Sequence, residues 1–411
     1  MNFERFDTGI ETYYYPMDNI RSVTIAFNIG VGAVYEPTSL LGISHFIEHA
    51  SFRGTKNFTM HQLKHIIESV GGILNAWTDK ENTLFYAKVP SFQAKESFDV
   101  LKEIVFSPLF SEKDIELEKE IIYQEYLSHK EDPVSNVYEL MYSNLLKGPH
   151  TKSVIGTEET IKKISRDDLL SFHDEMYVPY NTKVIIVGHL ENEALSYIKE
   201  KLNEKGGART IKHTSKVLTG IVKGKKMENA KQVHLLYVRP GLSLLSEERY
   251  SAMVLNTLLS SGMSSFLFEE IREKLGLVYD IYSMNMFQKE WGLFAIYVAT
   301  SLDKLDILNE KLFNLFSNFK LSDTLFEYGK KRLIGKLELS TESTSTITTM
   351  IVDYLTNDII PESPDQLIEK VNNVTKDSVE RVFEKIFLGD WSVVYVTPEN
   401  ENWHPKNLGV R

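Results

Sequence analysis

The sequence predicts an α+β fold built from two similar αβ domains. The chain has 411 residues, of which 42% are hydrophobic, and this length suffices for two domains of about 200 residues with a core each. Four glycines interrupt a polar, lysine-rich stretch in the middle of the chain: Gly206, Gly207, Gly220 and Gly224. The order of elements expected before this stretch begins again after it. We therefore expect an N-terminal domain over 1–205, a linker over 206–224 and a C-terminal domain over 225–411.

The composition excludes several classes of protein. The sequence has no cysteine, so any zinc must be held by histidine and carboxylate ligands. No apolar run approaches the roughly 18 residues of a membrane span, and the first residues lack the apolar core of a signal peptide. We therefore expect a cytoplasmic protein with no membrane partner. A net charge of −11 argues against nucleic acid as a partner and would favour basic peptides if the acid lines a chamber.

Residues 45–49 read His-Phe-Ile-Glu-His, which in a helix is the pattern of a zinc site with a general base. His45 and His49 would lie about 40° apart around the helix axis, so both imidazoles can reach one ion at about 2.0–2.1 Å. Glu48 would project from nearly the same side. It could take a proton from a water at the metal as that water attacks a carbonyl carbon. Catalytic zinc usually has three protein ligands, so a third must come from elsewhere.

A second histidine pair is interpreted differently. Thr59 and Gln62 form a capping-box pattern that opens a helix, and His61 and His65 would lie opposite its apolar stripe. We expect these two histidines at the surface. The first pair is surrounded by apolar neighbours, which predicts a mostly buried helix: Phe46, Ile47, Ala50 and Phe52.

A third ligand is expected on the helix predicted over 111–131. Glu118 and Glu125 fall on its apolar stripe, about 20° apart, because seven residues make nearly two turns. Burying two carboxylates is costly unless a cation or hydrogen-bond donors meet them, and a zinc ion would meet one. Ordinary salt bridges with Lys113 or Lys119 are the alternative.

Four segments together carry a family resemblance: 45–49, Arg53-Gly-Thr55, Gly71–Thr78 and Glu118–Glu125. They resemble the inverted-zincin metallopeptidases of the pitrilysin and mitochondrial-processing-peptidase type, peptidase family M16. The interval from His49 to Glu125 is the one that this family has between H-x-x-E-H and its distal glutamate. The resemblance implies Zn²⁺ as cofactor, with His45, His49 and Glu125 as ligands and Glu48 as general base. Glu118 would support the site without binding the metal.

The segment Ser260–Tyr279 resembles the C-terminal signature of the same family. The resemblance implies that Arg272 and Tyr279 reach the substrate near the zinc, although Arg272 taken alone would be a surface cation. An arginine can grip a peptide carbonyl, and a tyrosine hydroxyl can donate to an oxyanion. The chain departs from the family pattern at three places: Ser260 with Ser261, Phe266, and a stretch after His150 that is about two residues short.

Strands are expected over Ile73–Trp77, Thr83–Val89 and Lys183–Gly188. In the family, the strand around Asn75 and Ala76 adds a peptide to the sheet edge. Such pairing reads main chain, so we expect broad specificity that is set by enclosure.

The second half repeats this order, with strands at Val233–Val238, near Tyr279 and at Gly292–Thr300, and a helix ending at Leu259. It lacks H-x-x-E-H, so one zinc site per chain is expected. The Ser/Thr cluster from Ser340 to Thr349 continues with apolar residues at helical spacing, which predicts a packed helix instead of a phosphorylated tail.

The resemblance thus implies a zinc metalloendopeptidase that hydrolyses short or unfolded peptides in a closed chamber. Two αβ domains, each a mostly antiparallel sheet covered by helices, would form half of a clamshell. The expected assembly is a homodimer, or a heterodimer with a paralogue that lacks the zinc motif. Two alternatives are a non-catalytic peptide-binding or partner subunit and a hydrolase of small molecules. Retention of all five site residues argues against the first, and the peptide-pairing strand argues against the second.

Overall fold

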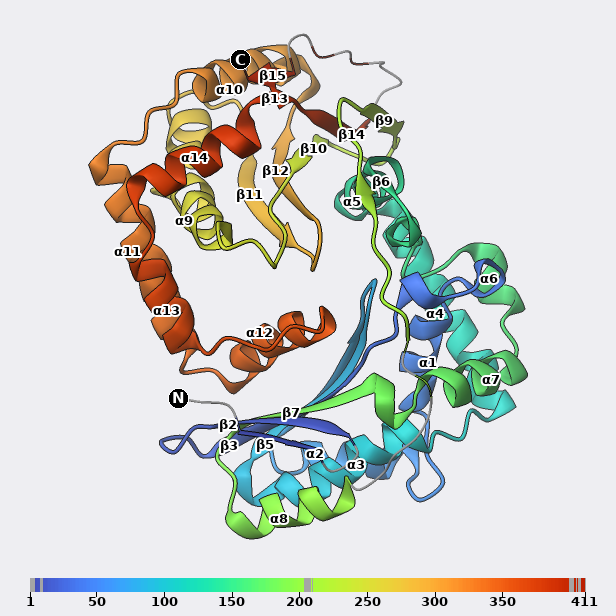
Figure 1. Ribbon diagram of the computed structural model, residues 1–411. Coiled ribbons are helices and arrows are strands. Elements are labelled where there is room, and N and C mark those ends of the chain that lie inside the picture. Colours follow the sequence, from blue (N-terminus) through green and yellow to red (C-terminus); the bar gives the residue numbers. More distant parts are fainter. Residues whose placement is uncertain are drawn as a thin grey trace. The chain divides into compact units, whose positions relative to one another are not determined.

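The computed structural model describes residues 4–7, 10–202, 208, 210–398, 403, 405 and 408–410. They form two compact units, each built on one large sheet (Figure 1). Unit 1 comprises Met1–Tyr126, Lys152–His213 and Ser340–Asp365, and unit 2 comprises Leu127–Thr151, Thr214–Leu339 and Gln366–Arg411. Each unit therefore contains a segment from the other half of the sequence.

Unit 1 contains a six-stranded sheet in the order β1-β2-β7-β3-β5-β4. Its strands are β1 (Glu4–Asp7), β2 (Glu11–Pro16), β3 (Ser22–Ile29), β4 (Ile73–Thr78), β5 (Thr83–Pro90) and β7 (Thr182–Gly188). All neighbouring pairs are antiparallel except β2 with β7. The sequence pattern does not predict β2, because its three consecutive buried tyrosines show no alternation of polar and apolar residues.

Unit 2 contains a five-stranded sheet in the order β11-β12-β10-β14-β9. Its strands are β9 (Val222–Lys226), β10 (Val233–Pro240), β11 (Asp280–Phe287), β12 (Gly292–Thr300) and β14 (Ser392–Thr397). Only β14 and β9 pair in parallel. Taken in chain order, these strands occupy the same places as β2, β3, β4, β5 and β7 of unit 1. The predicted duplication of a mostly antiparallel αβ unit is confirmed.

Helices cover the sheets. Unit 1 contains α1 (Ile43–Ser51), α2 (Met60–Glu68), α3 (Ala94–Phe106), α6 (Glu158–Lys163), α7 (Arg166–Met176) and α8 (Asn192–Lys201), and α4 (Glu112–Glu131) as far as Tyr126. The main helices of unit 2 are α9 (Arg249–Ser260), α10 (Leu305–Ser317), α11 (Asp323–Ser340) as far as Leu339, α13 (Pro364–Asn372) from Gln366, and α14 (Lys376–Phe387). The predicted helices at the two histidine pairs and near 111–131 are confirmed.

Two helices pack on the sheet of the unit formed mainly by the opposite half of the sequence. Helix α12 (Thr344–Thr356) follows α11 in sequence but packs on β3 and β7 of unit 1. Helix α5 (Pro133–Leu145) follows α4 but packs on β10 and β14 of unit 2. The predicted packed helix in the Ser/Thr-rich segment is confirmed as α12, which begins after the N-cap Ser343.

The expected linker is largely built into the two units. Residues 203–207 and 209 lie outside the described residues. Thr210 donates its N–H to Asn181 in unit 1, at 2.8 Å. Lys216–Val217 pairs with Leu146–Lys147, and β9 is an edge strand of the second sheet. Every residue of β9 is exposed, and three of its five residues are lysines, as is common in edge strands. This polar composition is why the sequence predicted a linker here.

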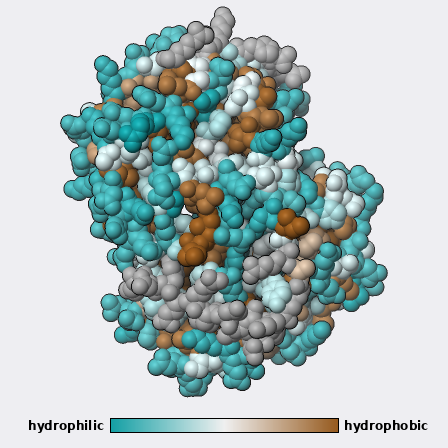
Figure 2. Space-filling view, viewed as in Figure 1, coloured by the Kyte–Doolittle hydropathy of each residue, from teal (hydrophilic) through white to brown (hydrophobic). Residues whose placement is uncertain are grey.

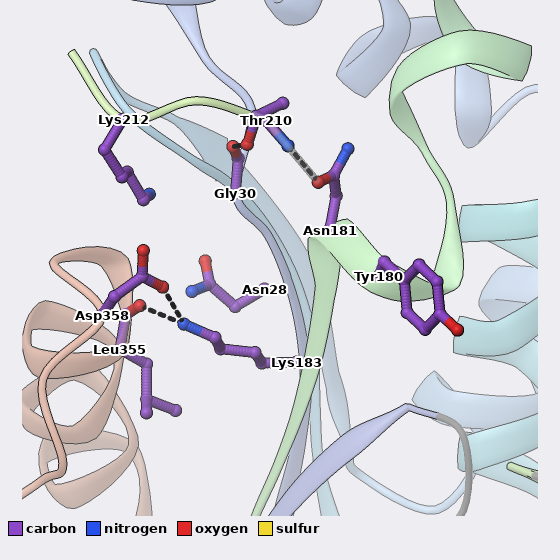
Figure 3. A pocket seen from close by; sticks show the side chains of 9 residues that line it. All are labelled: Asn28, Gly30, Tyr180, Asn181, Lys183, Thr210, Lys212, Leu355 and Asp358. Atoms are coloured by element: carbon purple, nitrogen blue, oxygen red, sulfur yellow. Dashed lines mark hydrogen bonds and ion pairs between the residues drawn. The ribbon is translucent and has the colours of Figure 1, made fainter. Parts of the chain in front are cut away.

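A polar pocket lies at the C-terminal end of α12 (Figure 3). The Lys183 ammonium donates to the Leu355 carbonyl and to Asp358, each at 2.6 Å, and Lys212 donates to the Thr356 carbonyl at 2.7 Å. Lysines near a helix C-terminus satisfy its last carbonyls and interact favourably with its dipole. The pocket is therefore interpreted as the attachment of α12 to the sheet of unit 1.

The surface is mixed in character. On the face shown in Figure 2, hydrophilic residues dominate and hydrophobic residues form separate patches. In the part of the chain that the structure describes, no helix combines the length and apolar character needed to span a bilayer.

Candidate metal centre

Helix α1 carries His45 and His49 one turn apart, and its first turn is anchored by a buried carboxylate. Gly42 is the N-cap, with a left-handed φ of 89° that favours glycine. The Glu36 carboxylate accepts hydrogen bonds from the Gly42 N–H at 2.7 Å and the Ser44 N–H at 3.0 Å. A negative charge is favourable at a helix N-terminus, where the first N–H groups lack partners. Glu36 therefore fixes where helix α1, which carries both histidines, begins.

Lys152 supports the same corner. Its ammonium donates to the Val34 carbonyl at 2.9 Å and to the backbone carbonyl of Glu36 at 2.6 Å. Burial raises the pKa of Glu36 to about 7, although the N–H donors and Lys152 oppose this shift. Sequence reasoning missed both residues, because Glu36 is too far from the helix start to match a local capping pattern. Lys152 lies in the short stretch after His150.

The structure brings together three predicted ligands, His45, His49 and Glu125. Glu125 Oε2 lies 3.6 Å from His45 Nε2 and 3.4 Å from His49 Nε2, and one ligand atom from each residue lies within 4.8 Å of the others. Ligands about 2.1 Å from a tetrahedral zinc would be roughly 3.4 Å apart. Two imidazoles and one carboxylate are also a donor set that zinc uses. The residues therefore fit a zinc ion.

Glu118 lies behind His49. Its Oε2 accepts a hydrogen bond from His49 Nδ1 at 3.1 Å, and its Oε1 accepts one from Arg53 Nε. The alternative considered from the sequence was a salt bridge between these glutamates and Lys113 or Lys119. Lys119 instead forms an ion pair with Glu116, at 2.7 Å. A carboxylate on the second nitrogen of a ligand histidine fixes the orientation of its ring and raises its basicity. Glu118 thus directs His49 Nε2 towards Glu125.

The charges around His49 favour a cation at this place. Burial lowers the pKa of His49, but hydrogen bonds to Glu118 and Glu125 outweigh it and raise the pKa to about 9. For Glu118, burial raises the pKa, but the hydrogen bonds from His49 and Arg53 have the larger effect and leave this pKa below its ordinary value. A metal ion would take the place of the imidazole proton, because only neutral histidine is a ligand.

Glu48 lies outside the group of three ligands. Its Oε2 accepts a hydrogen bond from the Thr78 hydroxyl at 2.6 Å. Burial raises the pKa of Glu48, and this bond and the charge on His49 oppose the rise. A carboxylate whose pKa is raised towards neutrality is better suited to accept and return a proton near pH 7.

The residues expected to contact substrate lie on two units. Asn75 and Ala76 are on β4, the strand at one edge of the unit 1 sheet. Arg272 is in a π-helical turn of unit 2 (Phe268–Glu273), where its guanidinium stacks on the Phe268 ring at 4.5 Å. Tyr279 is 68% exposed. Their contact with substrate stays a prediction.

Comparison with protein families identifies the chain. Residues 15–158 match the model described as "Insulinase (Peptidase family M16)", and residues 163–333 match the model described as "Peptidase M16 inactive domain". The chain belongs to the M16 peptidase family. The predicted resemblance is confirmed.

Relatives of this M16 chain extend over nearly its whole length. It is 28% identical to the "uncharacterized zinc protease YmxG" of Bacillus subtilis, over 92% of this chain and 94% of the relative. It is 29% identical to an "uncharacterized zinc protease" of Rickettsia felis, over 94% and 95%. Two solved structures share the fold. The first is a protease from Helicobacter pylori, with a TM-score of 0.88 and 18% identity, over 97% of this chain and 99% of that one. The second is a peptidase M16 inactive domain from Pseudomonas fluorescens, with a TM-score of 0.87 and 16% identity, over 99% of this chain and 100% of that one.

Proposed function

We propose that this M16 chain is a zinc metalloendopeptidase that hydrolyses short or unfolded peptides. The observation that carries the proposal is the ligand group His45, His49 and Glu125, whose spacing fits one ion, together with the separate carboxylate of Glu48, which is close enough to interact with the charges of His49 and Glu125. A structural metal site would not need this additional carboxylate, whereas hydrolysis needs a base next to the metal.

Each residue of the centre has a distinct chemical task. Zinc, when bound by the three ligands, would lower the pKa of a water molecule and polarise the peptide carbonyl. Glu48 accepts the proton of the attacking water and returns it to the leaving amine. Glu118 and Arg53 keep the His49 ring in the orientation needed for binding.

Substrate would be held mainly by its main chain. A peptide that adds to the edge strand β4 near Asn75 and Ala76 would pair through backbone groups, so its sequence would matter little. Arg272 would grip a peptide carbonyl, and the Tyr279 hydroxyl would donate to the oxyanion of the tetrahedral intermediate. Enclosure in a chamber completed by a second chain, identical or lacking the zinc motif, would select short or unfolded peptides.

A partner role without catalysis is the second candidate. The match of residues 163–333 to a model described as an inactive domain supports it. The complete ligand group in residues 45–125 favours the enzyme. The two candidates differ in whether the chain alone cleaves peptides.

A cleavage assay tests the proposal. The purified full-length chain, with one zinc per chain, is incubated with a library of unfolded peptides and with the same sequences inside folded proteins. We expect cleavage of the peptides alone, its loss after chelation and its return with added zinc. A zinc-loaded chain that cleaves no peptide would contradict the enzyme and support the partner role.

A further inference from the structure

We propose that Thr78 is a positioning residue for Glu48, whose hydroxyl helps to set the direction in which the carboxylate meets the attacking water. The inference rests on the proposed peptidase function. Thr78 is the last residue of β4, and α1, which carries Glu48, packs on this strand. Its hydroxyl donates to Glu48 Oε2 at 2.6 Å, a length typical of a charge-assisted hydrogen bond.

Strand β5 fixes the direction in which the Thr78 hydroxyl points. Thr83, the direct cross-strand partner of Thr78, is fully buried and donates its own hydroxyl proton to the Val31 carbonyl at 3.0 Å. The two threonine oxygens lie 3.5 Å apart, a much weaker contact than the one to Glu48. A hydroxyl has one proton, and that of Thr78 goes to the carboxylate. Because threonine is β-branched, few side-chain rotamers compete with this one.

The bond restrains the motion that matters for a base. The terminal torsion of a glutamate is broad, so an untethered carboxylate rotates and presents either oxygen in many directions. The Thr78 backbone also contributes a hydrogen bond to this carboxylate, so the hydroxyl is the second of two bonds from one residue. Together these bonds set the direction in which the Glu48 carboxylate meets the attacking water. The Thr78 hydroxyl is not part of the group that could hold zinc, and it is not one of the backbone groups of β4 that would pair with a peptide. Its removal would therefore lower kcat and leave KM and zinc occupancy unchanged.

The test compares Thr78→Val, which keeps the shape and loses the hydroxyl, with Thr78→Ser, which keeps the hydroxyl. Thr12→Val is a matched control, because Thr12 is also a buried threonine of this sheet and its hydroxyl donates to the nearby Ile10 carbonyl, at 3.1 Å, instead of to a residue of the candidate site. Each variant is loaded with one zinc, checked for cooperative thermal unfolding and assayed on one quenched unfolded peptide.

We expect Thr78→Val to lose about 10- to 100-fold in kcat, with KM within about twofold of the parent. This loss is smaller than the roughly 100- to 10,000-fold that a general base contributes to the rate, because Glu48 itself remains. Thr78→Ser and Thr12→Val would stay within about threefold of the parent. A parental kcat in Thr78→Val, or a loss that appears in KM or zinc content, would overturn the inference and leave the peptidase intact. An inactive parent chain would overturn both, since Glu48 would then have no reaction to serve.

Discussion

At the scale of single residues, identical side chains acquire different tasks from their surroundings. Glu118 and Glu125 occupy one stripe of α4, as the sequence pattern predicted, but only the Glu125 carboxylate faces the two histidine Nε2 atoms. Glu118 is 4% exposed and is held by His49 and Arg53. Periodicity placed both carboxylates on the side of the helix that faces His49. It could not separate their roles, because these depend on Arg53, which follows the C-terminal end of α1 and bonds Glu118.

This difference predicts a graded loss of zinc. Glu125→Gln removes a ligand and would weaken zinc binding more than Glu118→Gln, which should cost about 10- to 100-fold. Glu120→Gln, at an exposed position of the same helix, would bind like the parent. A competition titration with a chromogenic chelator measures all three. Equal affinities of the Glu125 and Glu120 variants would refute the ligand assignment.

At the scale of elements, the start of α1 was the part of the site that the sequence did not predict. The His-x-x-Glu-His spacing indicated the helix and the two ligands correctly. The distant carboxylate of Glu36 and the close approach of the backbone at Gly42 are tertiary features without a local sequence pattern. A Cβ on Gly42 would lie 2.7 Å from the Ile155 carbonyl oxygen.

A pair of glycine variants isolates this contact. Gly42→Ala and Gly71→Ala both place alanine at positive φ, which costs about 1–2 kcal/mol, but a Cβ on Gly71 would meet nothing within 4 Å. We expect Gly42→Ala to lose more stability in urea unfolding and to bind zinc more weakly. Zinc affinity that is unchanged in Gly42→Ala would show that the start of α1 does not control the ligands.

Glu36 also predicts a pH dependence of stability. Burial raises its pKa from the ordinary value of about 4.5 to about 7, so the folded chain holds this proton more tightly than the unfolded chain. The contribution of Glu36 is fully present below pH 4.5 and is lost as pH rises towards 7, by about 3 kcal/mol. Glu36→Gln cannot ionise. Its free energy of unfolding without metal, relative to the parent, should therefore increase from pH 4.5 to pH 8, and a constant difference would contradict this.

At the scale of the whole molecule, the repeated strand order was predictable, whereas the exchange of helices α5 and α12 was not. Apolar periodicity shows that a helix is buried but not against which sheet. Unit 1 therefore needs Ser340–Asp365, which the expected domain of residues 1–205 lacks. That fragment would expose the sheet face formed by Ala26, Ile185 and Val187.

A truncation tests this dependence. A fragment of residues 1–213 should lack cooperative unfolding and tight zinc binding, whereas the same fragment joined by a flexible linker to residues 340–365 should recover both. Near-ultraviolet circular dichroism during thermal unfolding and zinc titration provide the readouts. Native-like behaviour of the shorter fragment would show that α12 is dispensable for unit 1.

The proposed peptidase is tested most sharply by measuring peptide hydrolysis by the parent chain and by Glu48→Gln, each loaded with one zinc. Glu48 lies outside the group of three residues that could hold the metal, so the variant should bind zinc like the parent and lose about 100-fold or more in kcat. Cleavage by the parent alone, at equal zinc content, is the predicted result. Equal cleavage rates in the two proteins would contradict the role of Glu48 as the base.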